Sequence, residues 1–538
     1  MPRDVPGTIL PDRAAPILMP TINAALTIAG TCIFLVLIGL FGQFANRALV
    51  IGVLDIGHAL LLAAAITVGA ALAKRQRRLV PALLAGAAAG ALLGLATDAA
   101  RAANLRWIFV SLTPVTLNAI GYNADEPLAT IALALAGALA AALGAALVLM
   151  PVLPRRALLG ALAGATTAGL LRELIRNLFG NFAGIADWGF SYEGMLPAGA
   201  AVAALIGMTV ALRPGAATYA ALPNPAKRTI QAALLLLLLL LPALTNDFIG
   251  QVMMLVGLYT LMSLGLNIEL GLAGLVDLGF VAFFAVGAYT VALLTSPTSA
   301  LDWHLTFFQA LPFAIMAASA FGFLFGLPVL KVRGDYLAIA TLGLGEIIRV
   351  LVLSDMLKPW LGGAQGIVNI PKPDLFGTTL ASPTRLFYLT ASMAALAGYC
   401  AWRLQHSGLG RRWLAVREDE DVAQALGIHL VQVKLSAYTL GAAFAGLAGG
   451  LFAAMTGSVF PQSFQLLVSV NVLAILVVGG IGSLPGVLIG AATLIGAPEI
   501  LRDLGEYRYL IYGLVIIMVV RLKPDGLSPK AIRNREAV

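Results

Sequence analysis

The chain has 538 residues, of which 60% are hydrophobic and only 11% are charged, and its formal net charge is +8. This composition excludes a soluble globular protein and indicates an integral membrane protein. The positive charge does not indicate nucleic-acid binding, because the Lys and Arg residues cluster in short segments beside apolar runs, as the positive-inside rule describes.

Apolar runs long enough to cross a bilayer recur along nearly the whole chain. The first, at about 22–42, lacks a small-residue cleavage site and is expected to be a retained helix rather than a signal peptide. Residues 132–150 and 230–245 have the same character. Because these runs are continuous rather than alternating, they argue against a transmembrane barrel. The predicted fold is an all-α polytopic membrane protein.

The basic clusters predict the topology. Each is expected in the cytoplasm, so the number of crossings between successive clusters must be even. Counting on this basis gives about 16 transmembrane helices, about six N-terminal and about ten C-terminal, with both termini cytoplasmic. The clusters lie at residues 74–78, 155–156, 213–228, 331–333, 411–417 and 523–535.

A Pro- and Ala-rich connection at 213–228 divides the chain into two parts. Residues 1–220 are expected to form an N-terminal transmembrane extension of about six helices, and residues 221–538 a second domain. Within the extension, 105–122 and 178–194 combine aromatic and polar residues, which is typical of helices lying in the headgroup region. They either enlarge a docking surface for a partner or belong to a stabilising annex.

The stretch GLAGLVDLGF, residues 271–280, is the most unusual apolar segment. Gly271, Gly274 and Gly279 lie in it together with Asp277. Each Gly in a helix interior costs about 1 kcal/mol relative to Ala, so this density predicts a break, a re-entrant turn or a very tight crossing. Irregular backbone at membrane depth and an intramembrane acid both suit the lining of a translocation path.

Other glycines and acids have simpler explanations. Rows of small residues at 441–449 and 482–490 predict close helix packing. Glu269 is expected at a helix end, where it reaches the membrane interface. Glu346 precedes Arg349 by one helical turn, so either an internal ion pair or a pathway role explains it.

The sequence shows no enzyme signature and no metal-binding signature. No Lys follows a Gly, so the chain has no phosphate-binding loop of the G-x-x-x-x-G-K-[ST] type. The two Cys and four His residues lack ligand spacing. We therefore expect no catalytic residue, no metal site and no cofactor bound by this chain.

Residues 404–434 form a charged segment between two apolar runs. Its middle, DEDVAQALGI, predicts a short amphipathic helix that begins with acids and ends at Gly427. The apolar edge would comprise Ala423, Leu426 and Ile428. Such a helix could insert into a groove of another protein, although a solvated loop is an alternative.

Three motifs in this order carry a resemblance: GLNIELGLAGLVDLGFVAFFAVGAYT, the segment at 408–434, and GGIGSLPGVLIGA. Over about 230–525 the chain resembles the permease subunits of branched-chain amino-acid ABC importers, of the high-affinity type fed by a periplasmic binding protein. Phe280 stands where that family commonly has His or Tyr.

The resemblance implies residue roles. The segment at 404–434 would couple the permease to an ATPase, with motif positions Arg411, Ala415, Arg417, Glu418, Glu420, Ala423, Ala425 and Gly427. The expected substrate pathway, which follows from the Gly and acid pattern of the residues, comprises Gly271, Gly274, Asp277, Gly279, Phe280, Phe284 and Glu346.

The resemblance also implies partners: a second, unlike permease subunit, two cytoplasmic ABC ATPases that bind ATP and Mg²⁺, and a periplasmic substrate-binding protein, all at a bacterial inner membrane. The expected function is ATP-driven import of branched-chain or related amino acids by alternating access. Urea, amides or aromatic acids stay open as substrates. An ion-gradient-driven secondary transporter that uses Asp277 or Glu346 is the alternative.

Overall fold

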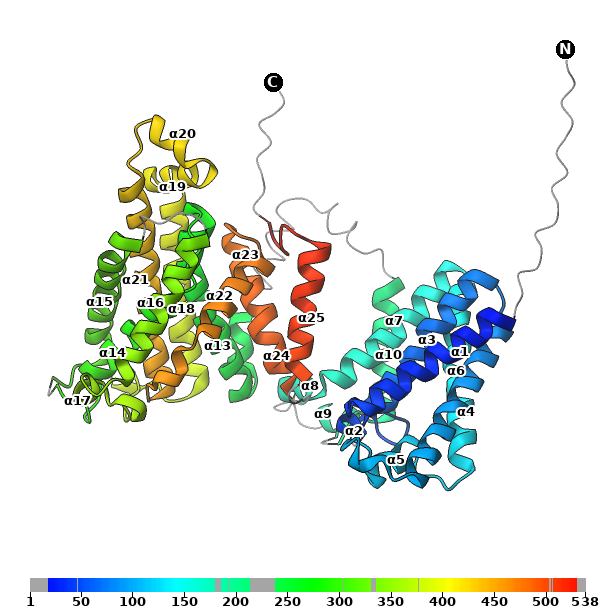
Figure 1. Ribbon diagram of the computed structural model, residues 1–538. Helices are drawn as coiled ribbons and strands as arrows, with labels where there is room; N and C mark the ends of the chain where they lie inside the picture. Colours follow the sequence, from blue (N-terminus) through cyan, green and yellow to red (C-terminus); the bar gives the residue numbers. More distant parts are fainter. Residues whose placement is uncertain are drawn as a thin grey trace, which may run out of the picture. The chain divides into compact units, whose positions relative to one another are not determined.

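The computed structural model describes residues 18–529 except 46, 180–184, 192, 213–237, 302, 330–334, 376, 503, 504 and 506. Contacts divide the chain into two compact units, Met1–Ala233 and Leu234–Val538. The described residues of both units are mostly helical (Figure 1). The connection at 213–228, which marks the boundary in the sequence, lies outside the described residues.

The N-terminal unit consists of long apolar helices joined by short helical turns and one small hairpin. Asp55 caps α3, because its Oδ1 accepts a hydrogen bond from the His58 backbone N at 2.7 Å. The elements are α1 (Leu18–Leu37), α2 (Leu40–Phe44), β1 (Ala48–Val50), β2 (Leu54–Asp55), α3 (Ile56–Gln76), α4 (Val80–Ala102), η1 (Leu105–Trp107), α5 (Pro114–Ile120), α6 (Leu128–Leu149), α7 (Val152–Leu170), α8 (Arg172–Phe179), α9 (Ile185–Gly189) and α10 (Pro197–Leu212).

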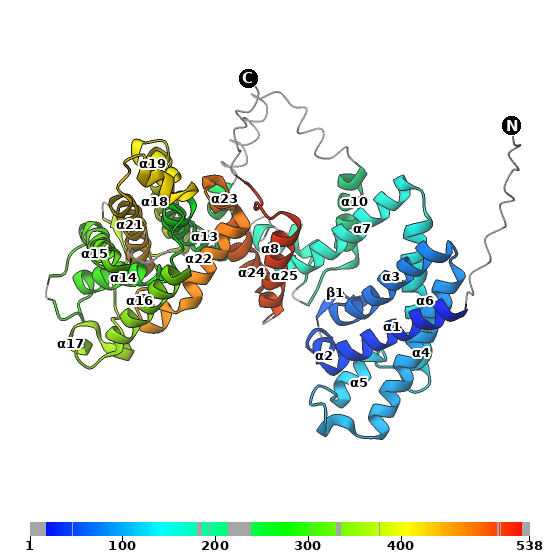
Figure 2. The ribbon, with the colours of Figure 1, turned by 45° about the horizontal axis from the view of Figure 1, so that its top comes forward.

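Small residues bring these helices into backbone contact. α4 and α3 both pack against α6, and α7 packs along α10 (Figure 2). A Cβ at Gly90 of α4 would collide with the carbonyl oxygen of Leu133 on α6, and one at Gly144 of α6 with that of Ile66 on α3. In lipid, where apolar side chains gain little by meeting, such close approach supplies the contact area that holds helices together.

The C-terminal unit surrounds one long helix, α21, which packs against α13, α14, α15 and α18 (Figure 2). The elements are α13 (Asp247–Leu266), η2 (Asn267–Leu272), α14 (Val281–Thr295), α15 (Phe307–Val329), α16 (Asp335–Leu353), α17 (Lys358–Leu361), η3 (Gly363–Gln365), β3 (Asp374–Leu375), β4 (Thr378–Thr379), α18 (Pro383–Gln405), α19 (Gly408–Glu418), α20 (Glu420–Ala425), α21 (Leu430–Thr456), η4 (Pro461–Phe464), α22 (Leu466–Gly479), α23 (Leu484–Ala491), η5 (Ala492–Gly496), α24 (Ala497–Ile500) and α25 (Tyr507–Leu522).

Eight described helices are long and apolar enough to cross a membrane, or up to ten if each of two bent pairs counts as one span. The eight are α1, α3, α4, α6, α13 with η2, α15, α16 and α21. The bent pairs are α7 with α8, at 72°, and α22 with α23 and α24, at 118°. The polytopic helical class is confirmed, whereas the count of about 16 is not, because α10 and α14 are short and part of the run at 230–245 lies outside the described residues.

The crossing of α4 and α6 supplies a stability test. We expect Gly90→Ala to lower the melting temperature in detergent by several degrees, because overpacking typically costs about 1–3 kcal/mol. Gly30→Ala on α1 is the matched control: a Cβ there meets nothing within 4 Å, so its melting temperature should be unchanged or slightly higher. Equal melting temperatures for both variants would contradict the close crossing.

Candidate functional site

The predicted break is present in the C-terminal unit. α13 ends in a single π-helical turn, Asn267–Leu272, and the chain then leaves helical geometry until α14 begins at Val281. Gly274 has φ +74°, which favours Gly over any residue with a side chain. A Cβ at Gly279 would collide with the carbonyl oxygen of Thr341, so the break also lies tightly against α16.

Several backbone donors in and beside the break are taken up by protein. Leu278 N donates to Thr341 Oγ1 on α16 at 3.0 Å, and Val281 N donates to Ser469 Oγ on α22 at 3.0 Å. Gly279 N donates to Asp277 Oδ1 at 2.7 Å. Unpaired amides at membrane depth cost several kcal/mol each, so these contacts are what allow a non-helical segment there. They also attach the break to two other helices.

Two acids lie wholly inside the unit beside this break. Glu269 and Asp277 are 0% and 1% exposed, and each interacts electrostatically with the other and with Tyr438 of α21. Both Glu269 oxygens, Asp277 Oδ2 and the Tyr438 hydroxyl lack a hydrogen-bond partner. The expectation that Glu269 reaches the interface is wrong, because α13 continues as a π-turn that carries the carboxylate inward against Gly441. Buried acids with unpaired oxygens at membrane depth mark a functional candidate.

The charged segment folds into two short helices, α19 and α20, at the end of the unit opposite α17 (Figure 1). Asp419 caps α20 by accepting hydrogen bonds from the backbone N of Asp421 and of Val422, both at 2.9 Å, and Gly427 follows with φ +82°. The predicted amphipathic helix is therefore present. Its apolar edge differs in part, because Ala423 is buried in the unit while Val422 and Leu426 are exposed.

Two contacts hold these helices on α21, and neither was foreseen from the sequence. The buried Trp413 donates from Nε1 to Val433 O at 3.1 Å and to Ser436 Oγ at 3.0 Å. Lys434, whose side chain is 6% exposed, lies 2.6 Å from Glu420. The one available signal in the sequence was Trp413, an aromatic residue within a charged segment. The two helices are thus fixed to a central membrane helix.

Arg417 connects α19 directly to the break. Its Nη1 donates to the carbonyl oxygen of Gly271, and its side chain packs against Gly274. The same π-helical turn joins the third motif, because Asn267 Oδ1 accepts a hydrogen bond from Gly482 N at 2.9 Å. The three motifs, far apart in sequence, therefore meet at one place.

The remaining residues that were predicted for the pathway or for coupling lie in the core, on α16 or on the surface of α19 and α20. Phe280 and Phe284 are buried in the core, the latter with its ring 5.5 Å from that of Phe464. Glu346 lies on α16, exposed and paired with Arg349, so the predicted ion pair is present. Among the predicted coupling positions, Arg411, Glu418, Ala425 and Gly427 are exposed and Ala415 is partly buried.

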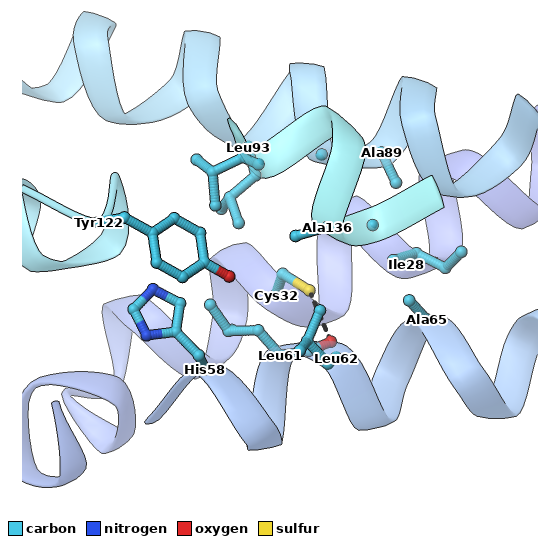
Figure 3. Close-up of a pocket in the computed structure, with 13 residues that line it drawn as sticks. Ile28, Cys32, His58, Leu61, Leu62, Ala65, Ala89, Leu93, Tyr122 and Ala136 are labelled. Atoms are coloured by element: carbon cyan, nitrogen blue, oxygen red, sulfur yellow. Dashed lines mark hydrogen bonds between the residues drawn. The ribbon is translucent and has the colours of Figure 1, made fainter. Parts of the chain in front are cut away.

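The N-terminal unit contains a small apolar cavity bordered by α1, α3, α4 and α6 (Figure 3). His58 and Tyr122 stack at one end of it, with ring centroids 4.0 Å apart. The His58 ring nitrogens lie 2.7 Å from Asp55 Oδ2 and 3.2 Å from Ile120 O. With both nitrogens engaged, His58 ties α3 to the end of α5. Within the described residues no group of three or more His, Cys, Asp or Glu could hold a metal ion.

Comparisons with known proteins agree with the three-motif resemblance. The family model described as branched-chain amino acid transport system / permease component matches residues 248–520. The LivM permease protein of the high-affinity branched-chain amino acid transport system is 41% identical in Salmonella typhimurium, over 51% of this chain and 68% of the relative. That of Escherichia coli K12 is 40% identical, over 55% and 74%. A LivH permease protein of Salmonella typhimurium is 25% identical, over 50% and 90%. No solved structure matches.

Fold and comparisons together define a multi-pass integral protein of the inner membrane, a transport subunit rather than an enzyme. The chain belongs to the branched-chain amino acid transport system permease family. The matched residues all lie within the C-terminal unit.

The attachment of α20 supplies a second stability test. We expect Glu420→Lys to destabilise the protein by about 1–3 kcal/mol, because it leaves the largely buried Lys434 ammonium without its partner and beside a like charge. The double variant Glu420→Lys/Lys434→Glu should recover most of that loss. Thermal unfolding in detergent measures both, and a double variant as unstable as the single one would show that the pair does not hold α20.

Proposed function

We propose that the chain is the membrane subunit of an ABC importer that moves branched-chain or related amino acids. Its partners in this proposal are two cytoplasmic ABC ATPases, a second, unlike permease and a periplasmic binding protein. ATP and Mg²⁺ would bind to the ATPases, and this chain would bind no cofactor of its own. The names of the related permeases support the substrate class, with urea, amides and aromatic acids as alternatives.

The exposed apolar edge of α20 is the observation that carries this proposal. Val422 and Leu426 are 55% and 77% exposed and lie one helical turn apart on the same face. Exposed apolar residues on a short, firmly attached helix suit insertion into a groove of another protein. The coupling residues in this proposal are Arg411, Ala415, Arg417, Glu418, Glu420, Ala423, Ala425 and Gly427.

The contact between Arg417 and Gly271 supplies the route from the ATPases to the membrane. When the ATPases close, α19 and α20 are displaced together, since Trp413 and Lys434 attach them to α21. Arg417 passes that displacement to the break, which is hydrogen-bonded to α16 and α22. Switching between inward- and outward-facing forms then follows from rearrangement around the break.

The substrate pathway of this proposal follows the break and α16. Its residues are Gly271, Gly274, Asp277, Gly279, Phe280, Phe284 and Glu346. Asp277, Phe280 and Phe284 are buried in this conformation, so they reach the pathway only when the helices around the break separate.

The proposed topology has 16 spans with both termini in the cytoplasm. Besides the eight long helices it counts α7, α10, α14, α18, α22, α23 with α24, α25 and the apolar run at 230–245. Two crossings, α4 and α6, separate the basic connections at 74–78 and 155–156, as an even count requires. Residues 1–220 form the N-terminal extension and 221–538 the permease domain, with coupling segment 404–434.

One observation favours a second candidate, an ion-gradient-driven transporter. The unpartnered oxygens of Glu269, Asp277 and Tyr438 form an oxygen-only cluster of the kind that ion-coupled carriers use. The chain alone in liposomes decides between the two: accumulation driven by a proton or sodium gradient without ATP supports this candidate, and no accumulation supports the importer.

Leu426→Asp tests the proposed insertion of α20. Placing a carboxylate in an apolar groove should prevent the ATPases from co-purifying and lower ATP-driven uptake at least tenfold. Gln424→Asp is the control, because it adds the same charge to the same helix on the face away from Val422 and Leu426. If the two variants behave alike, α20 does not dock through its apolar edge.

Arg417→Leu tests the transmission step. The ATPases should still bind and hydrolyse ATP, because Val422 and Leu426 are intact, but uptake should fall at least tenfold since the break is no longer attached to α19. Arg412→Leu, an exposed position on the same helix, is the control and should transport normally. Normal uptake by Arg417→Leu would show that coupling takes another route.

A further inference from the structure

An ion pair lies on the exposed face of α16, near the middle of a membrane span. Glu346 and Arg349 contact each other through three hydrogen bonds, and their side chains are 50% and 33% exposed. The span runs from Tyr336 to Leu353, which places Glu346 about 15 Å along it at ~1.5 Å per residue. A bilayer core is about 30 Å thick, so both charges lie near its centre.

Lipid cannot cover this face at low cost. Charged side chains at the bilayer centre face a bundle interior or water, because lipid tails offer them no hydrogen bonds. Ile339 and Val350, on the same side of α16 as Glu346, are also exposed. This side of the helix is therefore turned toward a water-filled path or the partner permease.

A narrow cavity lies directly beside the ion pair. Residues of α14, α16 and η4 line it, and nearly all are apolar; they include Ala285, Ile348, Val352 and Phe464. Of the ion pair, Arg349 lines this cavity and Glu346 does not. The space holds about one water molecule, so it is nearly closed in this conformation and must widen to admit a solute.

Tyr289 of α14 is the second polar group of the cavity. It is 5% exposed, and its hydroxyl has no hydrogen-bond partner. A buried hydroxyl without a partner is costly, so a ligand that supplies one is favoured. The cavity thus combines an apolar wall, an unpaired hydroxyl and the Arg349 guanidinium, which is hydrogen-bonded to Glu346 just outside the lining.

We propose that this cavity is a transient binding site for a zwitterionic aliphatic amino acid, with Arg349 on the substrate carboxylate, Glu346 on its ammonium group and the apolar wall against its side chain. The inference rests on the proposed function and names the substrate recognition within it. The substrate replaces an existing ion pair with two new ones, so no net charge enters the membrane. Urea and neutral amides lack both charges and are disfavoured.

The test uses the whole importer in liposomes, with binding protein loaded with labelled leucine, and measures uptake and ATP hydrolysis separately. Glu346→Gln and Arg349→Gln should each lower uptake at least tenfold. The charge swap Glu346→Arg/Arg349→Glu restores an internal ion pair but exchanges the positions of the two charges that would bind the substrate, so uptake should stay low. Swapping the Arg508–Glu499 pair of the same unit is the control and should leave uptake normal.

The outcomes separate this inference from the proposed function. If the unaltered importer shows no ATP-driven leucine uptake, the proposed function fails. If it transports and the swap recovers uptake to within twofold, the pair is only structural and the inference is overturned. Should the swap prevent assembly, Tyr289→Phe decides: uptake reduced several-fold with normal assembly supports the site, and unchanged uptake overturns it.

Discussion

The constraint on which the rest of the structure depends is that backbone polar groups at membrane depth need partners. A continuous helix meets this need internally, whereas the break between α13 and α14 meets it through other elements. Thr341 of α16, Ser469 of α22 and Arg417 of α19 each supply one contact to the segment from Gly271 to Val281. The hydrogen bonds that make the break possible therefore also attach it to α16 and α22, and Arg417 attaches the preceding π-turn to α19.

Local features of the backbone could be predicted from the sequence, whereas contacts between distant residues could not. The density of Gly around Asp277 predicted the break, and the acids at 419–421 predicted the start of α20. Glu269 was misplaced, because nothing in the sequence shows that the helix end continues as a π-turn directed inward. The partner of Arg417 lies 146 residues away, a distance at which residue type alone does not determine which carbonyl is met.

The glycine rows illustrate the same limit. Packing was the predicted role of Gly449 and Gly490, and a Cβ at either would collide with a carbonyl of a neighbouring element, Phe284 or Ile475. Gly441 belongs to the same pattern but makes room for the Glu269 carboxylate. Gly482 lies outside a helix with φ +82° and donates to Asn267. Spacing predicts close approach, but the group that approaches depends on the fold.

The break and the ion pair of α16 are mechanically linked. Gly279 lies against Thr341 of α16. A Cβ at Gly345, the residue before Glu346, would lie 3.4 Å from the Cα of Gly279. Close backbone contacts allow little independent movement of the two segments, since packed interiors transmit displacement rather than absorb it. In the proposed mechanism, a shift that begins at Arg417 would therefore reach α16 beside Glu346. In the proposed function, coupling and pathway are the two ends of one chain of contacts, several of which are close approaches at glycines.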